Sequence, residues 1–144
     1  MLVSTFGIIC WAKLRLRSLP DQESKTVKNF LAIYLGSESS ANHAKWETLD
    51  EATRQSREKA GMEGWMNWAK KNEAVIVDMG SPVGKTKQVN SAGIVDTSNM
   101  IAGYTIVRAE SHEAAATLFI NHPHFTIFPG DSVEIMEILS IPEM

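Results

Sequence analysis

The chain has 144 residues, of which 44% are hydrophobic and 22% charged, a composition typical of one soluble globular domain. Its 14 basic and 17 acidic residues give a net charge of -3, which argues against nucleic acid as a partner because phosphate binding needs a basic surface. The single cysteine, Cys10, excludes an internal disulfide and a multi-cysteine zinc site.

The first stretch of the chain, residues 1–12, is apolar and is followed by three basic residues. As a helix it would span about 18 Å, which is too short for a hydrocarbon core of roughly 30 Å. A secretory signal carries its positive charge before the apolar run, whereas here the charge follows it. We therefore expect a cytoplasmic protein with no membrane partner. Residues 1–28 are then an extension outside the fold, and residues 29–144 are the domain.

The strands are predicted from short apolar runs between turn residues. These runs are residues 30–35, 74–79, 103–109 and 132–139, with a shorter strand at 92–95. The polar segments 36–45 and 83–91 are predicted to be loops, and residues 96–99 a turn.

Two helices are predicted between the strands. The first runs over residues 49–72, where Thr48 and Glu51 have capping-box spacing. Gly61 and Gly64 either break this helix or mark a contact too close for a side chain. The second helix covers residues 111–121, with Ser111 as N-cap and Pro123 as the residue that stops it.

This order of elements predicts an α+β fold of ferredoxin-like type, an antiparallel sheet with two helices on one face. The last strand places Val133, Ile135 and Leu139 on one side and Met136 and Ile138 on the other. Both faces of the sheet are thus apolar, and the helices cover only one. A second copy of the chain is the simplest cover for the other face, which predicts a homodimer.

Two motifs suggest a bound group but lack the required partners. Gly84, Lys85 and Thr86 resemble the end of a phosphate-binding loop, but Met79 stands where the motif needs its first glycine. His122 and His124 flank Pro123 and could hold a metal, yet no third ligand is evident. The sequence therefore predicts no metal and no cofactor. The alternative for this pair is a histidine near the carbonyls of a helix end.

Other polar and aromatic side chains could serve a site or the fold. Asp78 interrupts an apolar strand, and it is either a catalytic acid or base or a strand-end residue that bonds the loop at Gly80. Trp65 and Trp68 could line a pocket for a flat ligand, or they could belong to the core or to a subunit interface.

Several segments together resemble the YCII-related domain family, in its DGPF-like branch. They are the strand and helix start over residues 102–115, the pair His122-Pro123, the strand at 133–135 and the turn Gly80-Ser81-Pro82. The resemblance covers about residues 29–142. It implies a dimeric α+β barrel with a cleft between sheet and helices.

The resemblance also bears on function, because some members look like enzymes with a histidine on the first helix paired with an aspartate. Here the first helix has no histidine, Glu63 falls near that place, and His122 precedes Pro123. One hypothesis is a lyase or isomerase for a small molecule. His122 would act as the base, and Glu63 or Asp78 would be its carboxylate partner.

In this hypothesis Trp65, Trp68 and His124 hold a small organic substrate. The alternative is a non-catalytic dimeric protein that binds a ligand or a partner. A shared cavity for His122 and a carboxylate would favour the enzyme, and their separation would favour the alternative.

Overall fold

The computed structural model describes residues 26–142, so the predicted extension lies almost wholly outside the described residues. A four-stranded antiparallel sheet forms the centre, in the order β2-β5-β1-β6. Its strands are β1 (Lys28–Leu35), β2 (Ile76–Asp78), β5 (Ile101–Ala109) and β6 (Ser132–Glu137). This mixed α+β arrangement is consistent with the predicted ferredoxin-like type.

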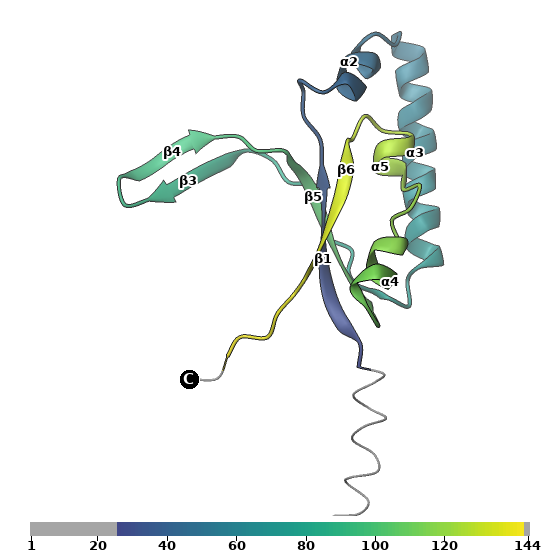
Figure 1. Ribbon diagram of the computed structural model, residues 1–144. Helices are drawn as coiled ribbons and strands as arrows, with labels where there is room; N and C mark the ends of the chain where they lie inside the picture. Colours follow the sequence, from purple (N-terminus) through teal and green to yellow (C-terminus); the bar gives the residue numbers. More distant parts are fainter. Residues whose placement is uncertain (1–25, 143–144) are drawn as a thin grey trace, which may run out of the picture.

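The described residues form four helices, and all of them lie on the same side of the sheet (Figure 1). The long helix is α3 (Glu51–Lys71); the others are α2 (Ala41–Glu47), α4 (His112–Thr117) and α5 (Pro123–Thr126). The expectation of two helices was therefore too low, because two short helices accompany α3 and α4.

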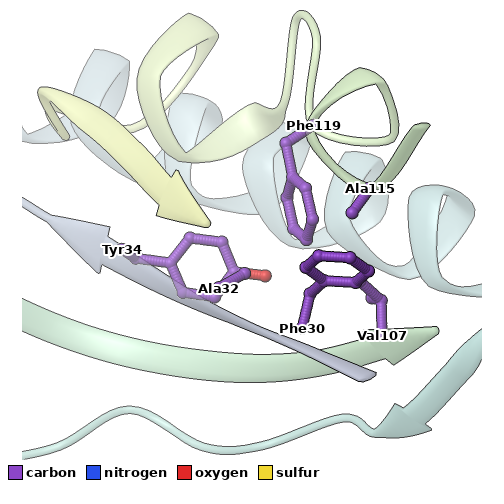
Figure 2. Packing of buried hydrophobic residues seen from close by; sticks show 6 residues of the cluster. All are labelled: Phe30, Ala32, Tyr34, Val107, Ala115 and Phe119. Carbon is purple, nitrogen blue, oxygen red and sulfur yellow. The ribbon is translucent and has the colours of Figure 1, made fainter. Parts of the chain in front are cut away.

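Strand β1 supplies much of the core. Alternate residues of a strand point to opposite faces, and Phe30, Ala32 and Tyr34 are all buried on the face toward the helices. They meet Val107 on β5, together with buried residues of the α4 region; Figure 2 shows Ala115 and Phe119 packed against the ring of Phe30. The other face of the sheet, which we call the open face, carries no helix (Figure 1).

The centre of the open face is apolar, as the sequence predicted. In the register of the sheet, Leu31 pairs with Ile106 and Met136, whereas Ile33 pairs with Tyr104 and with the charged Glu134. Met136 and Glu134 are exposed, and the other residues are half-buried. Only residues 26–142 enter this description, and within them nothing packs over the open face as the helices do over the opposite one.

The segment after β2 forms a hairpin, in which the predicted loop 83–91 contains a first strand and the predicted short strand at 92–95 lies in the second. Its strands are β3 (Thr86–Asn90) and β4 (Gly93–Thr97), which pair only with each other in the strand ladders. The sequence underestimated this element because its residues are mostly polar. The hairpin projects from the sheet on the side away from the helices (Figure 1).

Two helix boundaries also differ from the prediction. Segment 36–45 contains the start of α2, whose N-cap is Ser40. Thr48 ends that helix instead of opening the next one, and Asp50 caps α3 by accepting a hydrogen bond from the backbone N–H of Thr53 at 3.0 Å. A serine or aspartate just before a helix accepts hydrogen bonds from its free N–H groups. Ser40 and Asp50 were therefore both valid signals for the start of a helix.

The second helix is divided in two. Ser111 caps α4 as predicted, but α4 ends at Thr117, and Asn121 has a positive φ of 58° in the connection that follows. Pro123 begins α5 rather than stopping α4. Proline suits the first turn of a helix because the N–H that it lacks has no helical partner there.

No helix formed by residues 26–142 has both the length and the apolar character that crossing a membrane requires.

Candidate functional site

A pocket of about 440 Å³ opens between α3 and the first half of β5. Three side chains of α3 form one wall: Met62, Trp65 and Met66. Residues three and four positions apart lie on the same face of a helix, so this wall follows directly from their spacing. The same spacing, which also includes Ala69, predicts an apolar face of this helix from the sequence alone.

The opposite wall is the turn after β2 together with the start of β5. Gly80 has a φ of +72°, and a Cβ there would collide with the backbone carbonyl of Tyr104. The Asp78 carboxylate accepts a hydrogen bond from the Gly80 N–H at 2.8 Å. Pro82 then pairs with Gly103 across an isolated bridge. Backbone atoms therefore come close to the pocket, because two glycines leave this wall without side chains.

Tyr34 lies at the sheet end of the pocket and is tied to the turn after β2. Thr105 donates a hydrogen bond from its hydroxyl to the carbonyl of Met79 at 3.0 Å, so the Tyr34 hydroxyl donates to Thr105 at 2.7 Å. Burial raises the pKa of Tyr34 to about 12, and the bond to Thr105 offsets only part of this. The phenol is thus neutral and keeps acceptor capacity toward the pocket.

His124 is the histidine that lines the pocket. Its Nε2 lies 2.8 Å from the carbonyl oxygen of Leu35, which makes Nε2 the protonated nitrogen. Burial lowers the pKa of His124, although the carbonyl of Leu35 and the charge of Asp131 act in the opposite direction. The ring packs directly on Gly130, where a Cβ would collide with it.

His122 is fully buried and lies apart from the pocket lining. Its Nδ1 accepts a hydrogen bond from the backbone N–H of His124 at 3.0 Å, which caps α5 and places the proton of a neutral ring on Nε2. That Nε2 has no hydrogen-bond partner among the described residues. The rings of Trp65 and Trp68 stand nearly perpendicular to the imidazole, with centroids 4.5 and 4.7 Å away.

This environment keeps His122 uncharged. Burial lowers its pKa to about 4, and the neighbouring His124 lowers it further. An imidazole with such a pKa is a weak base at neutral pH, and its free nitrogen carries the proton rather than the lone pair.

The structure separates the predicted site residues into two groups. Trp65 and His124 line the pocket. Trp68 instead packs against the core and donates from its indole nitrogen to the carbonyl of Leu118 at 2.8 Å. Glu63 is exposed on α3, and the exposed Asp78 serves the turn at Gly80. Among the described residues, neither carboxylate forms a hydrogen bond or ion pair with His122.

The two glycines of α3 allow α5 and the turn after it to pack closely against this helix. Helix α3 is continuous, so Gly61 and Gly64 do not break it but mark a contact too close for a side chain. A Cβ at Gly61 would lie 2.5 Å from the ring of Phe128, and one at Gly64 would lie 3.3 Å from Pro123. Small residues at both positions let α5 and the following turn sit directly on α3, which brings Phe128 to the pocket.

Sequence reasoning missed Tyr34 and Phe128 as pocket residues. Each lies in an apolar run that indicates core, and no local pattern shows which core residue borders a cavity. Within residues 26–142, no cluster of three or more potential metal ligands exists.

The chain matches no protein-family model and no curated protein. Among solved structures it is similar to 5-chloro-2-hydroxyhydroquinone dehydrochlorinase from Burkholderia phenoliruptrix, in complex with 2,5-dihydroxybenzoquinone. The sequences are 13% identical, and the match covers 74% of this chain and 89% of that chain with a TM-score of 0.42. Similarity at this level carries no argument about activity.

Proposed function

We propose that this protein binds a small, flat, uncharged organic molecule in the pocket between α3 and β5. The observation that carries this proposal is the composition of the pocket. Aromatic and methionine side chains supply most of its walls, and its volume of about 440 Å³ falls in the range of small-molecule sites. Flat ligands suit such walls because aromatic rings stack or meet edge to face with them.

The lack of charged residues in the lining restricts the class of ligand further. None of the described residues around the pocket is Asp, Glu, Lys or Arg, so a charged ligand would be buried without a counter-ion. Polar groups are still present: the hydroxyls of Tyr34 and Ser81 belong to lining residues, as does the imidazole of His124. A phenol or a similar ring with one or two hydroxyl or carbonyl groups matches this chemistry.

Binding without catalysis is the version that the geometry supports best. The lyase or isomerase hypothesis needs His122 and either Glu63 or Asp78 to share one cavity with the substrate. His122 is instead enclosed by aromatic rings, and the Asp78 carboxylate already accepts from the Gly80 N–H. This separation is the outcome that favours the non-catalytic alternative.

We also propose that the protein is a homodimer that packs open face to open face, as in the dimeric α+β barrel of the YCII-related family. Support comes from the apolar residues of the open face and from the sequence resemblance over residues 29–142. An apolar sheet face of this kind is otherwise costly to leave in water.

The binding proposal is tested with 2-naphthol, a flat neutral probe with one hydroxyl. We expect calorimetric titration to show one site per chain, with binding that also changes the fluorescence of Trp65. The variant Met66→Glu places a charge at the pocket wall and should weaken binding about tenfold, because a carboxylate must then be desolvated by the bound ring.

The matched control is Ile120→Glu. Met66 and Ile120 are 68% and 65% exposed, but Ile120 lies in the connection between α4 and α5 and is not a lining residue. This control should bind 2-naphthol like the wild type. Equal binding by both variants, or no binding by the wild type, would contradict the proposal.

A further inference from the structure

The β3–β4 hairpin, which we call the arm, projects from the body of the protein, and its apolar side chains are exposed in the described part of the chain. Val89 and Ile94 pair across the arm and are 73% and 67% exposed. Val95 is exposed on the other face of the arm. An isolated two-stranded hairpin is at best marginally stable in water, so an arm of this kind needs something to pack against.

The base of the arm is firmly joined to the sheet. Val83 donates from its backbone N–H to the carbonyl of Ala102 at 3.0 Å, next to the bridge between Pro82 and Gly103. Asn99 then donates from its side chain to the Thr86 hydroxyl at 3.2 Å. The arm is therefore a continuation of the ladder between the turn after β2 and β5, and its direction is set by the sheet.

That direction leads to the side of the open face. In Figure 1 the helices lie on one side of the sheet, and the arm and the segment after β6 leave on the other. This segment adds exposed apolar residues of its own, among them Leu139 and Ile141. A partner molecule that covered the open face would thus lie beside the apolar side chains of the arm.

The arm would enlarge an interface built on the open face. A standard interface buries about 800 Å² of accessible surface on each partner, and the exposed side chains of Val89, Ile94 and Val95 add to what the four strands supply. In a two-fold arrangement each arm reaches across to the other copy, and both arms contribute at once.

We propose that the arm packs against a second copy of this chain and, together with the open face, completes the dimer interface. This inference rests on the proposed homodimer and adds the residues that secure it. A second copy suits the arm because Val89 and Ile94 are apolar, whereas the ion pair of Lys87 and Asp96 at its root is already formed within the arm. Interfaces between identical chains are the more apolar class.

The test compares two variants of the full chain by sedimentation over a range of concentrations. Ile94→Lys charges the arm, and Ile120→Lys changes an equally exposed isoleucine on the helix side, at 67% and 65% exposure. We expect the dissociation constant of the dimer to rise at least tenfold for Ile94→Lys and to stay unchanged for Ile120→Lys. The variant Ile94→Thr keeps a β-branched residue, so the hairpin should be retained while part of the apolar contact is lost. It should weaken the dimer less than Ile94→Lys does.

Hydrogen exchange gives a second measurement that does not depend on a variant. Amides of residues 86–97 should exchange slowly in concentrated protein and faster on dilution. If Ile94→Lys dimerises as tightly as the wild type, or if these amides exchange fast at every concentration, the arm is not part of the interface, although an open-face dimer would stand. A wild-type protein that stays monomeric would overturn both the homodimer and the arm, while the ligand proposal would be unaffected.

Discussion

The imidazole of His122 is packed among aromatic rings, and its Nδ1 already accepts the backbone N–H of His124. It therefore closes the start of α5 and fills the core at the same time. Burial of the neutral ring leaves only its Nε2–H without a hydrogen-bond partner among the described residues, whereas a charge there would be placed in an apolar site without a counter-ion. The protonation of His122 is accordingly coupled to folding.

We expect stability to fall as the pH decreases from about 6.5 toward 4. The pKa of His122 is about 4 in the folded protein and 6.5 in the unfolded chain, so the unfolded chain takes up the proton first as the pH falls. This difference amounts to about 3 kcal/mol once the pH is below 4. Above pH 6.5 both states are neutral and the effect vanishes.

The variant His122→Asn tests this coupling, since asparagine is a good N-cap but does not titrate. Urea unfolding at pH 7 and pH 4.5 should show that the wild type loses about 2 kcal/mol more than the variant does between these pH values. The lowered pKa of His124 acts in the same direction in both proteins. An identical loss in the two proteins would show that His122 is not the titrating group.

Individual site residues were predictable where spacing alone places them. Met62, Trp65 and Met66 form one helical face, and this face borders the pocket. His124 was a candidate because it stands next to Pro123 in the sequence. The environment of His122 was not predictable, because burial among rings from β1, α3 and the α4 region depends on tertiary packing and not on its neighbours in the chain.

At the scale of elements, the turn between α5 and β6 depends on one close contact. Gly130 faces the ring of His124, and its N–H donates to the His124 carbonyl at 2.9 Å. A side chain at this position would push the histidine away from the pocket wall. The turn thus couples the start of β6 to the site.

Gly130→Ala should lower the free energy of unfolding by about 1–3 kcal/mol, the usual cost of overpacking a tight site. Gly84→Ala is the control, because nothing lies within 4 Å of a Cβ placed there. It should change stability by less than about 0.5 kcal/mol. Chemical denaturation of both variants measures the difference, and equal stability would mean that the contact with His124 is loose.

The strands of the sheet could be predicted because apolar runs such as 30–35 and 103–109 are bounded by turn residues. The first strand of the arm could not, since the run from Thr86 to Asn90 is mostly polar and only its pairing with β4 makes it a strand. Helix α2 was missed for a similar reason. Its segment is rich in serine and asparagine, and the cap at Ser40 is evident only once the helix is known.

In the molecule as a whole, the described residues already form a core between the sheet and its helix layer. The buried cluster consists of residues from Phe30 onward, and β1 begins at Lys28. The strand pairings that hold the sheet together lie mainly between β1, β5 and β6. We therefore propose that residues 29–144 form the folding unit.

Removal of residues 1–27 should leave the thermal midpoint within about 10 °C of the full chain, since ~1 kcal/mol shifts the midpoint by roughly 2–8 °C at this size. Scanning calorimetry of both proteins measures this. A larger drop would show that the first part of the chain packs on the domain and that the domain boundary is wrong.

The central claim, a pocket for a flat neutral ligand, is tested most directly by following the backbone amides in a ¹H–¹⁵N spectrum during titration with 2-naphthol. The largest shifts should occur at Trp65, Ser81, Gly103 and His124, which come from separate elements but border the same cavity. Shifts confined to the open face or to the arm, or no shifts at millimolar probe, would contradict it.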